Sequence, residues 1–309
     1  MLMLKRAFLP VMIFCALLST RSAHAQYYFL NDRYYGQDFT FELGGSVGAM
    51  NAFTDLGGNK GIGKNFVKDF NLKNTRPSFG LYALATYREA IGVRLEGTFG
   101  SVQAYDSILK KDGKSTFGRY ERNLSFRSRI TDVQLSFEIH PLFFKMYSED
   151  EAPFFSPYLV AGVGYFAFNP QAQLNGKWYD LQPLRTEGQG FAQYPDRKPY
   201  KLSQINIPVG VGLRYELTPS IYTRLEVVHR FLFTDYLDDV STTYIDPNAF
   251  YLNLPPNLAS IAEQMHNRNI PGSGYQTGGP GDQRGDSKDK DSYFTIQLKF
   301  GFVLRNEPR

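Results

Sequence analysis

The sequence of 309 residues contains almost no cysteine, because Cys15 is the only one and lies in an apolar run near the N-terminus. Small secreted domains held by disulfides are therefore excluded. Long apolar runs are scarce too: beyond residue 25 no segment of roughly 18 or more apolar residues occurs, which excludes transmembrane helices. A basic excess is also absent, since the formal net charge is only +4. Nucleic acid is not an expected partner.

The N-terminal segment has the pattern of a cleaved secretory signal. Two basic residues precede an apolar run from Ala7 to Leu18, and the small-residue pattern Ala23-His24-Ala25 follows it. We expect residues 1–25 to be removed. The loss of three basic residues lowers the formal net charge from +4 to +1. An exported chain without disulfides then needs a large hydrogen-bonded fold for its stability.

Aromatic residues and strict alternation are what the chain has in abundance. Aromatic side chains make up 16% of the sequence, with 21 Tyr and 26 Phe. Alternation is clearest in 206–231, where apolar residues occupy one face of an extended chain and Arg224, Glu226 and Arg230 occupy the other. A soluble sandwich with its charges in water and a membrane barrel with its charges inside both satisfy this pattern.

The spacing of the alternating segments favours the barrel. Eight segments are expected as strands: Asp38 to Ala49, Pro77 to Arg88, Ile91 to Val102, Arg127 to Leu142, Phe155 to Phe168, Leu202 to Leu217, Ile221 to Thr234 and Tyr293 to Leu304. Their connectors alternate between long and short, as in outer-membrane barrels with short periplasmic turns and long external loops. We predict an all-β fold, an eight-stranded antiparallel transmembrane barrel over 38–304, with periplasmic segments at 26–37 and 305–309.

The two faces of these segments predict a lipid-facing wall and a charged interior. Apolar rows such as Val133, Leu135 and Phe137 suit lipid. The opposite faces carry charges of nearly balanced sign that can pair in a lumen just wide enough for side chains to fill it. This expected lumen network comprises Glu42, Arg94, Glu96, Asp132, Glu138, Arg214, Glu216, Arg224, Glu226, Arg230 and Lys299. An open diffusion pore is not expected.

Four local features carry further predictions. The fifth segment would place the large aromatic side chains of Tyr158, Phe166 and Phe168 in the lumen. Its register could therefore be reversed, or the strand could end early. Tyr215 and Tyr222 flank a short turn, where an inner aromatic girdle is expected. One short loop helix is predicted from Leu258 to Met265, with Asn257 as its cap. Residues 271–291, dense in Gly, Asp and Lys, are expected to form a mobile loop tip.

Three groups of polar residues suggest chemistry but have simpler explanations. The acids Asp235, Asp238, Asp239 and Asp246 could gather around calcium, although a solvated acidic loop is favoured. His140 and His229 could serve a lipid hydrolase, but no paired serine and acid can be assigned to His229, for which a structural role at the membrane interface is favoured. The tripeptide at 284–286, Arg-Gly-Asp, is a short adhesion motif that occurs often by chance. No catalytic residue, cofactor or metal is therefore predicted.

Several longer stretches resemble a known family. They are "RNLSFRSRITDVQLSFE" (122–138), "PYLVAGVGYFAFNP" (157–170), "GKWYDLQPLRTEGQG" (176–190), "FTDYLDDVSTTYIDP" (233–247) and "QRGDSKDKDSYF" (283–294). Together they are similar to the PorG-like outer-membrane barrels of Bacteroidota, from about Phe39 to Leu304. The resemblance implies a non-enzymatic component of the type IX secretion and gliding machinery, which anchors a periplasmic lipoprotein ring.

Three functions stay open on the sequence: a secretion-machine anchor, a small surface barrel for adhesion or envelope integrity, and a lipid-modifying barrel enzyme. The expected location is the outer membrane, with its lipid as one partner and the lipoprotein ring as the other. A ring in the periplasm would dock on the periplasmic turns. The acids Glu149, Asp150 and Glu151 form a compact patch there that could attract a basic partner, or could be a solvated turn.

Overall fold

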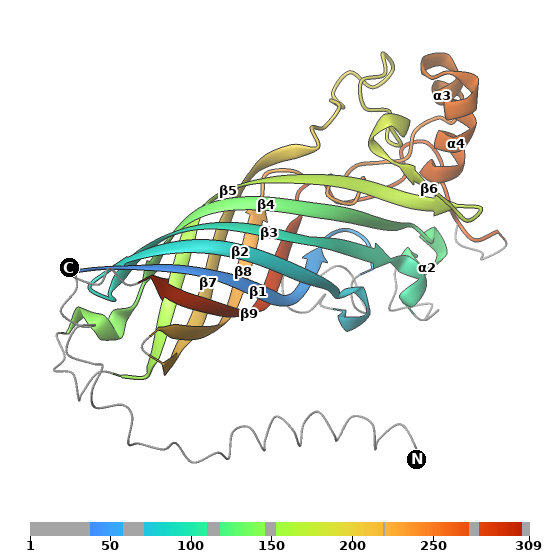
Figure 1. Cartoon of the computed structure of the whole chain (residues 1–309). Coiled ribbons are helices and arrows are strands. Elements are labelled where there is room, and N and C mark those ends of the chain that lie inside the picture. Colours follow the sequence, from blue (N-terminus) through green and yellow to red (C-terminus); the bar gives the residue numbers. More distant parts are fainter. Residues whose placement is uncertain are drawn as a thin grey trace, which may run out of the picture. The chain divides into compact units, whose positions relative to one another are not determined.

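Eight strands close into an antiparallel barrel in the computed structural model, which describes residues 38–57, 71–109, 118–145, 153–218, 220–271 and 278–304 (Figure 1). The barrel strands are β1 (Phe39–Phe53), β2 (Arg76–Tyr87), β3 (Ile91–Tyr105), β4 (Ser125–Ile139), β5 (Phe155–Leu174), β7 (Ser203–Thr218), β8 (Ile221–Leu232) and β9 (Ser292–Leu304). All eight expected segments are strands, and the predicted fold class is confirmed.

Each barrel strand pairs with its neighbours in chain order, and the first strand pairs with the last. β1 and β9 run antiparallel from Phe41 opposite Leu304 to Phe53 opposite Ser292. The ring is completed on the other side by the β4–β5 pairing. Closure matters because an open edge would leave backbone N–H and C=O groups unpaired, which hydrocarbon does not tolerate.

The connections sort by end of the barrel. At one end lie the shorter links, as at Arg88 and Glu89 between β2 and β3, where both residues have positive φ (48° and 56°). The longest of these links joins β4 to β5 and carries η5 (Pro141–Phe144). At the other end lie four long connections, which carry the extra elements η3 (Leu72–Asn74), η4 (Asp106–Ile108), α2 (Arg119–Arg122), β6 (Lys177–Asp180), η7 (Gln182–Leu184), α3 (Asn248–Asn253) and α4 (Pro256–His266). The predicted asymmetry of the loops is confirmed.

Strand alternation separates an apolar exterior from a polar interior. On β4, the side chains of Val133, Leu135 and Phe137 are 49–58% exposed, whereas Asp132 and Glu138, which flank them in the sequence, are fully buried. The same period of two holds around the ring, because each wall strand has lipid or solvent on one side and the lumen on the other.

The fifth strand answers the two alternatives that the sequence left open. β5 neither reverses nor ends early: Tyr158, Phe166 and Phe168 are buried inside the barrel as the simple alternation requires, and the strand continues to Leu174. Its extension forms a hairpin with β6 through Asn175 and Gly176, both at positive φ. Asn-Gly is the preferred pair for such a two-residue turn.

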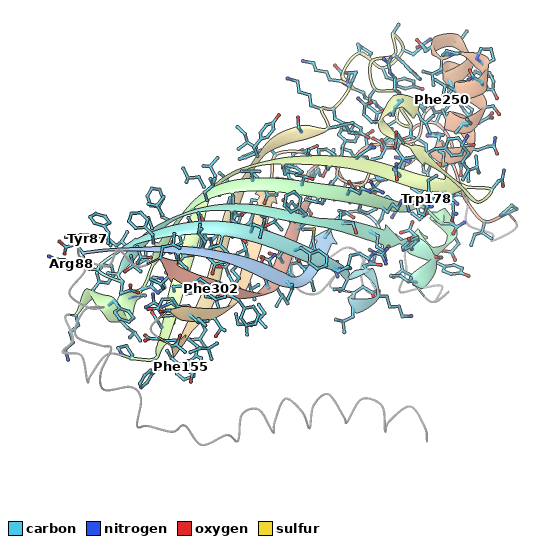
Figure 2. All side chains as sticks on the ribbon, in the orientation of Figure 1. Tyr87, Arg88, Phe155, Trp178, Phe250 and Phe302 are labelled. Atoms are coloured by element: carbon cyan, nitrogen blue, oxygen red, sulfur yellow. The ribbon has the colours of Figure 1, made fainter. Side chains whose placement is uncertain are left out.

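The hydrophobic core lies at the long-loop end, where the described parts of the four long connections pack over the barrel mouth. We call this assembly the outer cap. An aromatic series runs from the barrel into it, with ring centroids of Phe168 and Tyr200 6.2 Å apart and those of Tyr200 and Tyr236 4.8 Å apart. Residues Phe250, Ala262 and Met265 of α3 and α4 join the same buried cluster. Figure 2 shows Trp178 and Phe250 at this end, opposite Tyr87 and Arg88.

Details of the outer cap differ from the sequence prediction. Helix α4 is present, but its N-cap is Pro255, and Asn257 lies within the first turn. Two shorter helices, α2 and α3, accompany it, so a single loop helix was an underestimate. The expected loop tip was also wrong in part, because Arg284 and Asp291 are buried; residues 272–277 lie outside the described ranges. Within those ranges no helix has the length and apolar character needed to cross a membrane.

Candidate functional site

The centre of the lumen is an ion cluster around Arg94. Its guanidinium contacts Glu138 at 2.5 Å and Glu226 at 2.7 and 3.1 Å, and its Nε lies 3.1 Å from a carboxylate oxygen of Glu96. The Lys299 ammonium completes the cluster, at 2.5 Å from Glu96 and 2.8 Å from Glu226. All five side chains are at most 1% exposed. Two cations therefore hold three carboxylates in the middle of the barrel.

Further ion pairs lie on either side of this cluster. Arg224 binds Glu42, which also accepts a hydrogen bond from Tyr82 at 2.5 Å. Arg230 binds Asp132 at 2.6 Å and donates to Gln134 at 3.2 Å. Asp132 also accepts from Asn206 at 2.9 Å. Each of these two carboxylates thus receives at least two donors, which offsets the loss of its hydration.

The eleven charged residues expected in the lumen all lie buried on the inner face: Glu42, Arg94, Glu96, Asp132, Glu138, Arg214, Glu216, Arg224, Glu226, Arg230 and Lys299. The sequence did not reveal the partner of Arg214, which is Glu89 of the β2–β3 turn. Thr40 also donates to Glu89, at 2.9 Å. The only signal for this pair in the sequence is the acidic residue in the turn, Glu89. The short connector directs its side chain into the lumen.

The lumen is filled by these side chains. Arg94, Arg224, Arg230, Tyr158 and Tyr293 are among the largest fully buried side chains of the described residues. An eight-stranded barrel has room for side chains or one small ligand, and here the side chains occupy that room. The arrangement supports a packed wall and does not provide a wide aqueous path.

A serine, a histidine and an acid meet at the short-turn end of the lumen. His140 Nδ1 lies 3.0 Å from Ser156 Oγ, and His140 Nε2 lies 3.3 Å from a Glu138 oxygen. The sequence offered no such trio. Its geometry is that of a nucleophile, base and acid, but the three side chains are buried, with Tyr158 stacked on the imidazole at 5.0 Å. A substrate has no access to Ser156 in this arrangement.

Aromatic residues mark both borders of the apolar belt. At the short-turn end Tyr215 packs against Phe155, with ring centroids 4.7 Å apart, as the expected inner girdle requires. Tyr222 does not belong to the girdle: it is 1% exposed and lies in the lumen, on the same face as Arg224. At the other border His229 packs among Phe53 and neighbouring aromatic rings. This placement fits the structural role for His229.

The outer cap is joined by a buried network around Arg284. Its guanidinium donates to Glu187 at 2.9 Å and to the carbonyl of Asp239 at 2.7 Å, while its own carbonyl accepts from Arg122 at 2.6 Å. Arg122 in turn binds Asp106 at 2.8 and 3.0 Å. The Arg-Gly-Asp tripeptide therefore cannot present its arginine to a partner, and it serves to join three loops.

His266 of α4 anchors the same cap in its neutral form. Its Nδ1 donates to the Thr186 carbonyl at 2.6 Å, and its Nε2 accepts from the Ile245 N–H at 3.3 Å. Burial, together with the positive charge of Arg284, lowers the pKa of His266 to about 3. Since one ring nitrogen must accept, the neutral imidazole fits both contacts.

The acids that the sequence suggested for calcium form part of the cap. Asp239 accepts from Thr186 and Tyr200 at 2.5 and 2.6 Å, while Asp246 is exposed near the start of α3. Within the described ranges no group of three or more His, Cys, Asp or Glu side chains is placed to hold a metal ion. The expected solvated acidic loop is also wrong, because Asp235, Asp238 and Asp239 are buried.

Burial shifts the ionisation of several of these carboxyls. It raises the pKa of Asp235 to about 8 and that of Asp55 to about 6, with the neighbouring carboxyls adding to both shifts. Asp238 and Asp291 have pKa values well above the ordinary range for the same reason. At neutral pH the carboxyl groups of Asp235, Asp238 and Asp291 are therefore held in their neutral form at the base of the outer cap.

The acidic patch Glu149, Asp150 and Glu151, predicted as a docking surface, lies outside the described residues, as does the rest of 146–152. The described elements on either side of it, η5 (Pro141–Phe144) after β4 and the start of β5, lie at the short-turn end. Docking on this patch stays a prediction.

Comparison with known proteins gives one family and a set of distant structures. The family described as "Domain of unknown function (DUF6089)" matches residues 40–252. No match was found among curated protein sequences. Similar solved structures include Neisserial surface protein A, NspA (9% identity, 87% of this chain and 98% of that chain, TM-score 0.38). Two others are OprG of Pseudomonas aeruginosa (10%, 86% and 96%, 0.36) and a major outer membrane protein of Thermus thermophilus (12%, 87% and 100%, 0.34).

Proposed function

The chain belongs to the DUF6089 family, and from its closed, ion-paired barrel we propose that it is a non-enzymatic outer-membrane protein that anchors the type IX secretion machinery. In this role the barrel holds a periplasmic lipoprotein ring against the membrane. The packed lumen is the observation that carries the proposal, because a barrel without a wide path suits attachment better than transport.

The placement in the outer membrane is supported by the surface of the barrel. Apolar side chains such as Leu81, Phe137 and Leu225 stand 54–69% exposed around the wall, a pattern costly in water and favourable in lipid. Aromatic rings border this belt at both ends, and the closed ring gives each of the eight barrel strands a partner on both sides. The expected export signal at residues 1–25 is consistent with this location.

The secretion role is supported by the similarity of five long stretches to PorG-like barrels, which include the segment 233–247. That segment holds Asp239 and Tyr244, both buried in the outer cap. The similarity thus covers residues that build the fold of the cap as well as the strands. The docking of the ring itself belongs to the periplasmic turns, where Glu149, Asp150 and Glu151 offer negative charge to a basic partner.

Crosslinking in native membranes followed by purification of the barrel tests this function. The expected result is recovery of a periplasmic lipoprotein with the barrel, and a strong loss of it when Glu149, Asp150 and Glu151 are replaced by Ser or Asn. A matched control changes two exposed acids of the outer loops, Asp196→Asn with Asp289→Asn, which should leave recovery unchanged. Loss of lipoprotein recovery in the control variant alone would place the docking surface at the long-loop end.

A second candidate is a surface barrel for adhesion or envelope integrity. The observation that favours it is the packed outer cap, since a barrel used only as a periplasmic anchor does not need an ordered external structure. Adhesion would have to use the cap surface, because Arg284 of the adhesion-like tripeptide is buried. Binding of the purified barrel to host or matrix surfaces, with no lipoprotein recovered after crosslinking, would favour this function over the first.

The third candidate, a lipid-modifying enzyme, rests on Ser156, His140 and Glu138. Their burial argues against it, since lipid cannot reach Ser156 Oγ. Altered lipid A in a deletion strain, reproduced by Ser156→Ala in an otherwise folded barrel, would support this candidate and overturn the non-enzymatic assignment.

A further inference from the structure

A groove lies on the barrel wall near the long-loop end, beside β5 and β7 and the chain that follows β8. It has a volume of about 560 Å³ and is lined by Tyr165, Lys201, Ser203, Gln204, Ile205 and Phe233. We propose that this groove binds a phosphorylated lipid of the outer leaflet. Its acyl chain lies along Ile205 and Phe233, and its phosphate meets the Lys201 ammonium.

The groove sits at the outer border of the apolar belt. On β5, Val163 and Tyr165 are 54% and 56% exposed and continue the apolar wall. Four residues further along the strand, at about 3.3 Å per residue, the chain becomes polar: Asn169 and Gln171 both donate to Asp180, at 2.9 and 2.7 Å. The change from hydrocarbon to headgroup therefore falls within a length of about 13 Å along β5. The groove lies at this level.

The walls of the groove offer an apolar track. Ile205 pairs with Tyr165 across the β5–β7 ladder, and both side chains project outward. Phe233 is 64% exposed and lies just beyond the end of β8, two residues after Phe231 of the apolar belt. An acyl chain that follows the belt would meet these three side chains in succession and cover apolar surface that the fold leaves open.

The rim of the groove offers a positive charge and hydrogen-bonding groups. Lys201 is exposed, and it forms no ion pair with any residue in the described ranges. None of the six lining residues is acidic. Tyr165 Oη donates to Ser203 Oγ at 2.7 Å, which fixes the phenol beside the rim. An ammonium above an apolar track is complementary to a lipid with an anionic phosphate ester.

The inference rests on the proposed placement in the outer membrane and is independent of the proposed secretion role. Fractionation of cells tests that placement separately, because recovery of the protein in a soluble fraction would refute the membrane location. Failure of lipid selectivity in a correctly located barrel would refute only the lipid site in the groove. The two failures are therefore distinguishable.

Native mass spectrometry of the folded full-length barrel in detergent tests the lipid site. The probes are dioctanoyl phosphatidate and dioctanoylglycerol, which share their acyl chains and differ in the phosphate. We expect phosphatidate to bind about fivefold more tightly, the effect of one lysine near a membrane surface. Lys201→Gln should remove this preference. Lys73→Gln, at another exposed lysine of the long-loop end, should keep it.

A second variant examines the apolar track. Phe233→Ser should weaken both probes without changing the ratio between them, because it removes contact with the acyl chain and leaves Lys201 in place. Equal binding of the two probes by the wild type, or an unchanged preference in Lys201→Gln, would overturn the proposal. Full competition by inorganic phosphate would also overturn it, since the groove would then be a simple anion site.

Discussion

Replacing Arg94 by glutamine should destabilise the barrel more than any single surface change. Arg94 and Lys299 together face Glu96, Glu138 and Glu226. The variant leaves one cation for three carboxylates that are at most 1% exposed. Removing one partner of a buried ion pair costs about 3 to 5 kcal/mol, because neither water nor enough opposite charge compensates the carboxylates that remain. This cost is a large fraction of the free energy of unfolding, which is about 5 to 15 kcal/mol for a typical protein.

The barrel contains its own control for this measurement. Arg88 and Asp38 form an ion pair at 2.8 Å, but their side chains are 57% and 61% exposed. Arg88→Gln should therefore cost less than about 1 kcal/mol, as measured for exposed pairs elsewhere. Both changes in the free energy of unfolding can be measured by urea unfolding in lipid vesicles. The readout is the difference in gel mobility between the folded and the unfolded barrel. Comparable costs for Arg94→Gln and Arg88→Gln would refute the buried-charge argument.

A double variant separates lost charge from lost packing. Glu226 accepts two hydrogen bonds from Arg94, so Arg94→Gln with Glu226→Gln returns the cluster to a single excess carboxylate, the same as in the wild type. The cost of the double variant should be smaller than the sum of the two single costs by roughly 0.5 to 3 kcal/mol, the range for residues in one network. Strict additivity would show that volume, and not charge, determines the loss.

Three other predictions concern the cap and the lumen. Between pH 6.5 and 8 folded His266 is neutral, and the unfolded imidazole loses at most about half a proton, so the carboxyls dominate the pH dependence. Asp235, with its pKa raised from 3.8 to about 8, keeps in the folded state a proton that the unfolded chain has lost. Cap stability should fall from pH 6.5 to 8, and Asp235→Asn should flatten that fall in hydrogen-exchange protection factors of α4; a rise with pH would contradict the assignment. Arg284→Gln leaves Glu187 buried without its cation and should expose the cap to limited proteolysis while the gel mobility of the barrel stays unchanged; resistance equal to wild type would show that the network is dispensable. Planar bilayer recordings should show no wide, steady conductance, and a stable open channel would disprove the packed lumen.

Strands and faces could be predicted from sequence because one environment repeats around the whole wall. Every strand has lipid or solvent on one side and the lumen on the other, so a period of two is imposed on all eight. The error at Tyr222 arose where nearness to a turn was given more weight than this period: Tyr222 shares its parity with Arg224 and therefore points inward.

Pairing partners and the outer cap could not be predicted, because they depend on contacts between distant segments. Arg94 and Glu226 are 132 residues apart, and Arg284 and Glu187 are 97 apart. Locally, Arg284 stands in a segment rich in Gly, Asp and Lys that has the composition of a solvated loop. Only the meeting of four loops over one mouth buries it. Glu89 was missed for a similar reason, since nothing in so short a turn indicates that its acid reaches Arg214.

The seam between β1 and β9 constrains how the molecule is made. These strands pair over the full span from Phe41 with Leu304 to Phe53 with Ser292, yet they are the first and last to leave the ribosome. The contacts between them have the longest sequence separation in the ring, and contacts of long sequence separation are slow to form. Until β9 arrives, β1 keeps an open edge able to pair with another chain. Export of this protein thus requires that the unfinished sheet be shielded until its final thirteen-residue strand is delivered.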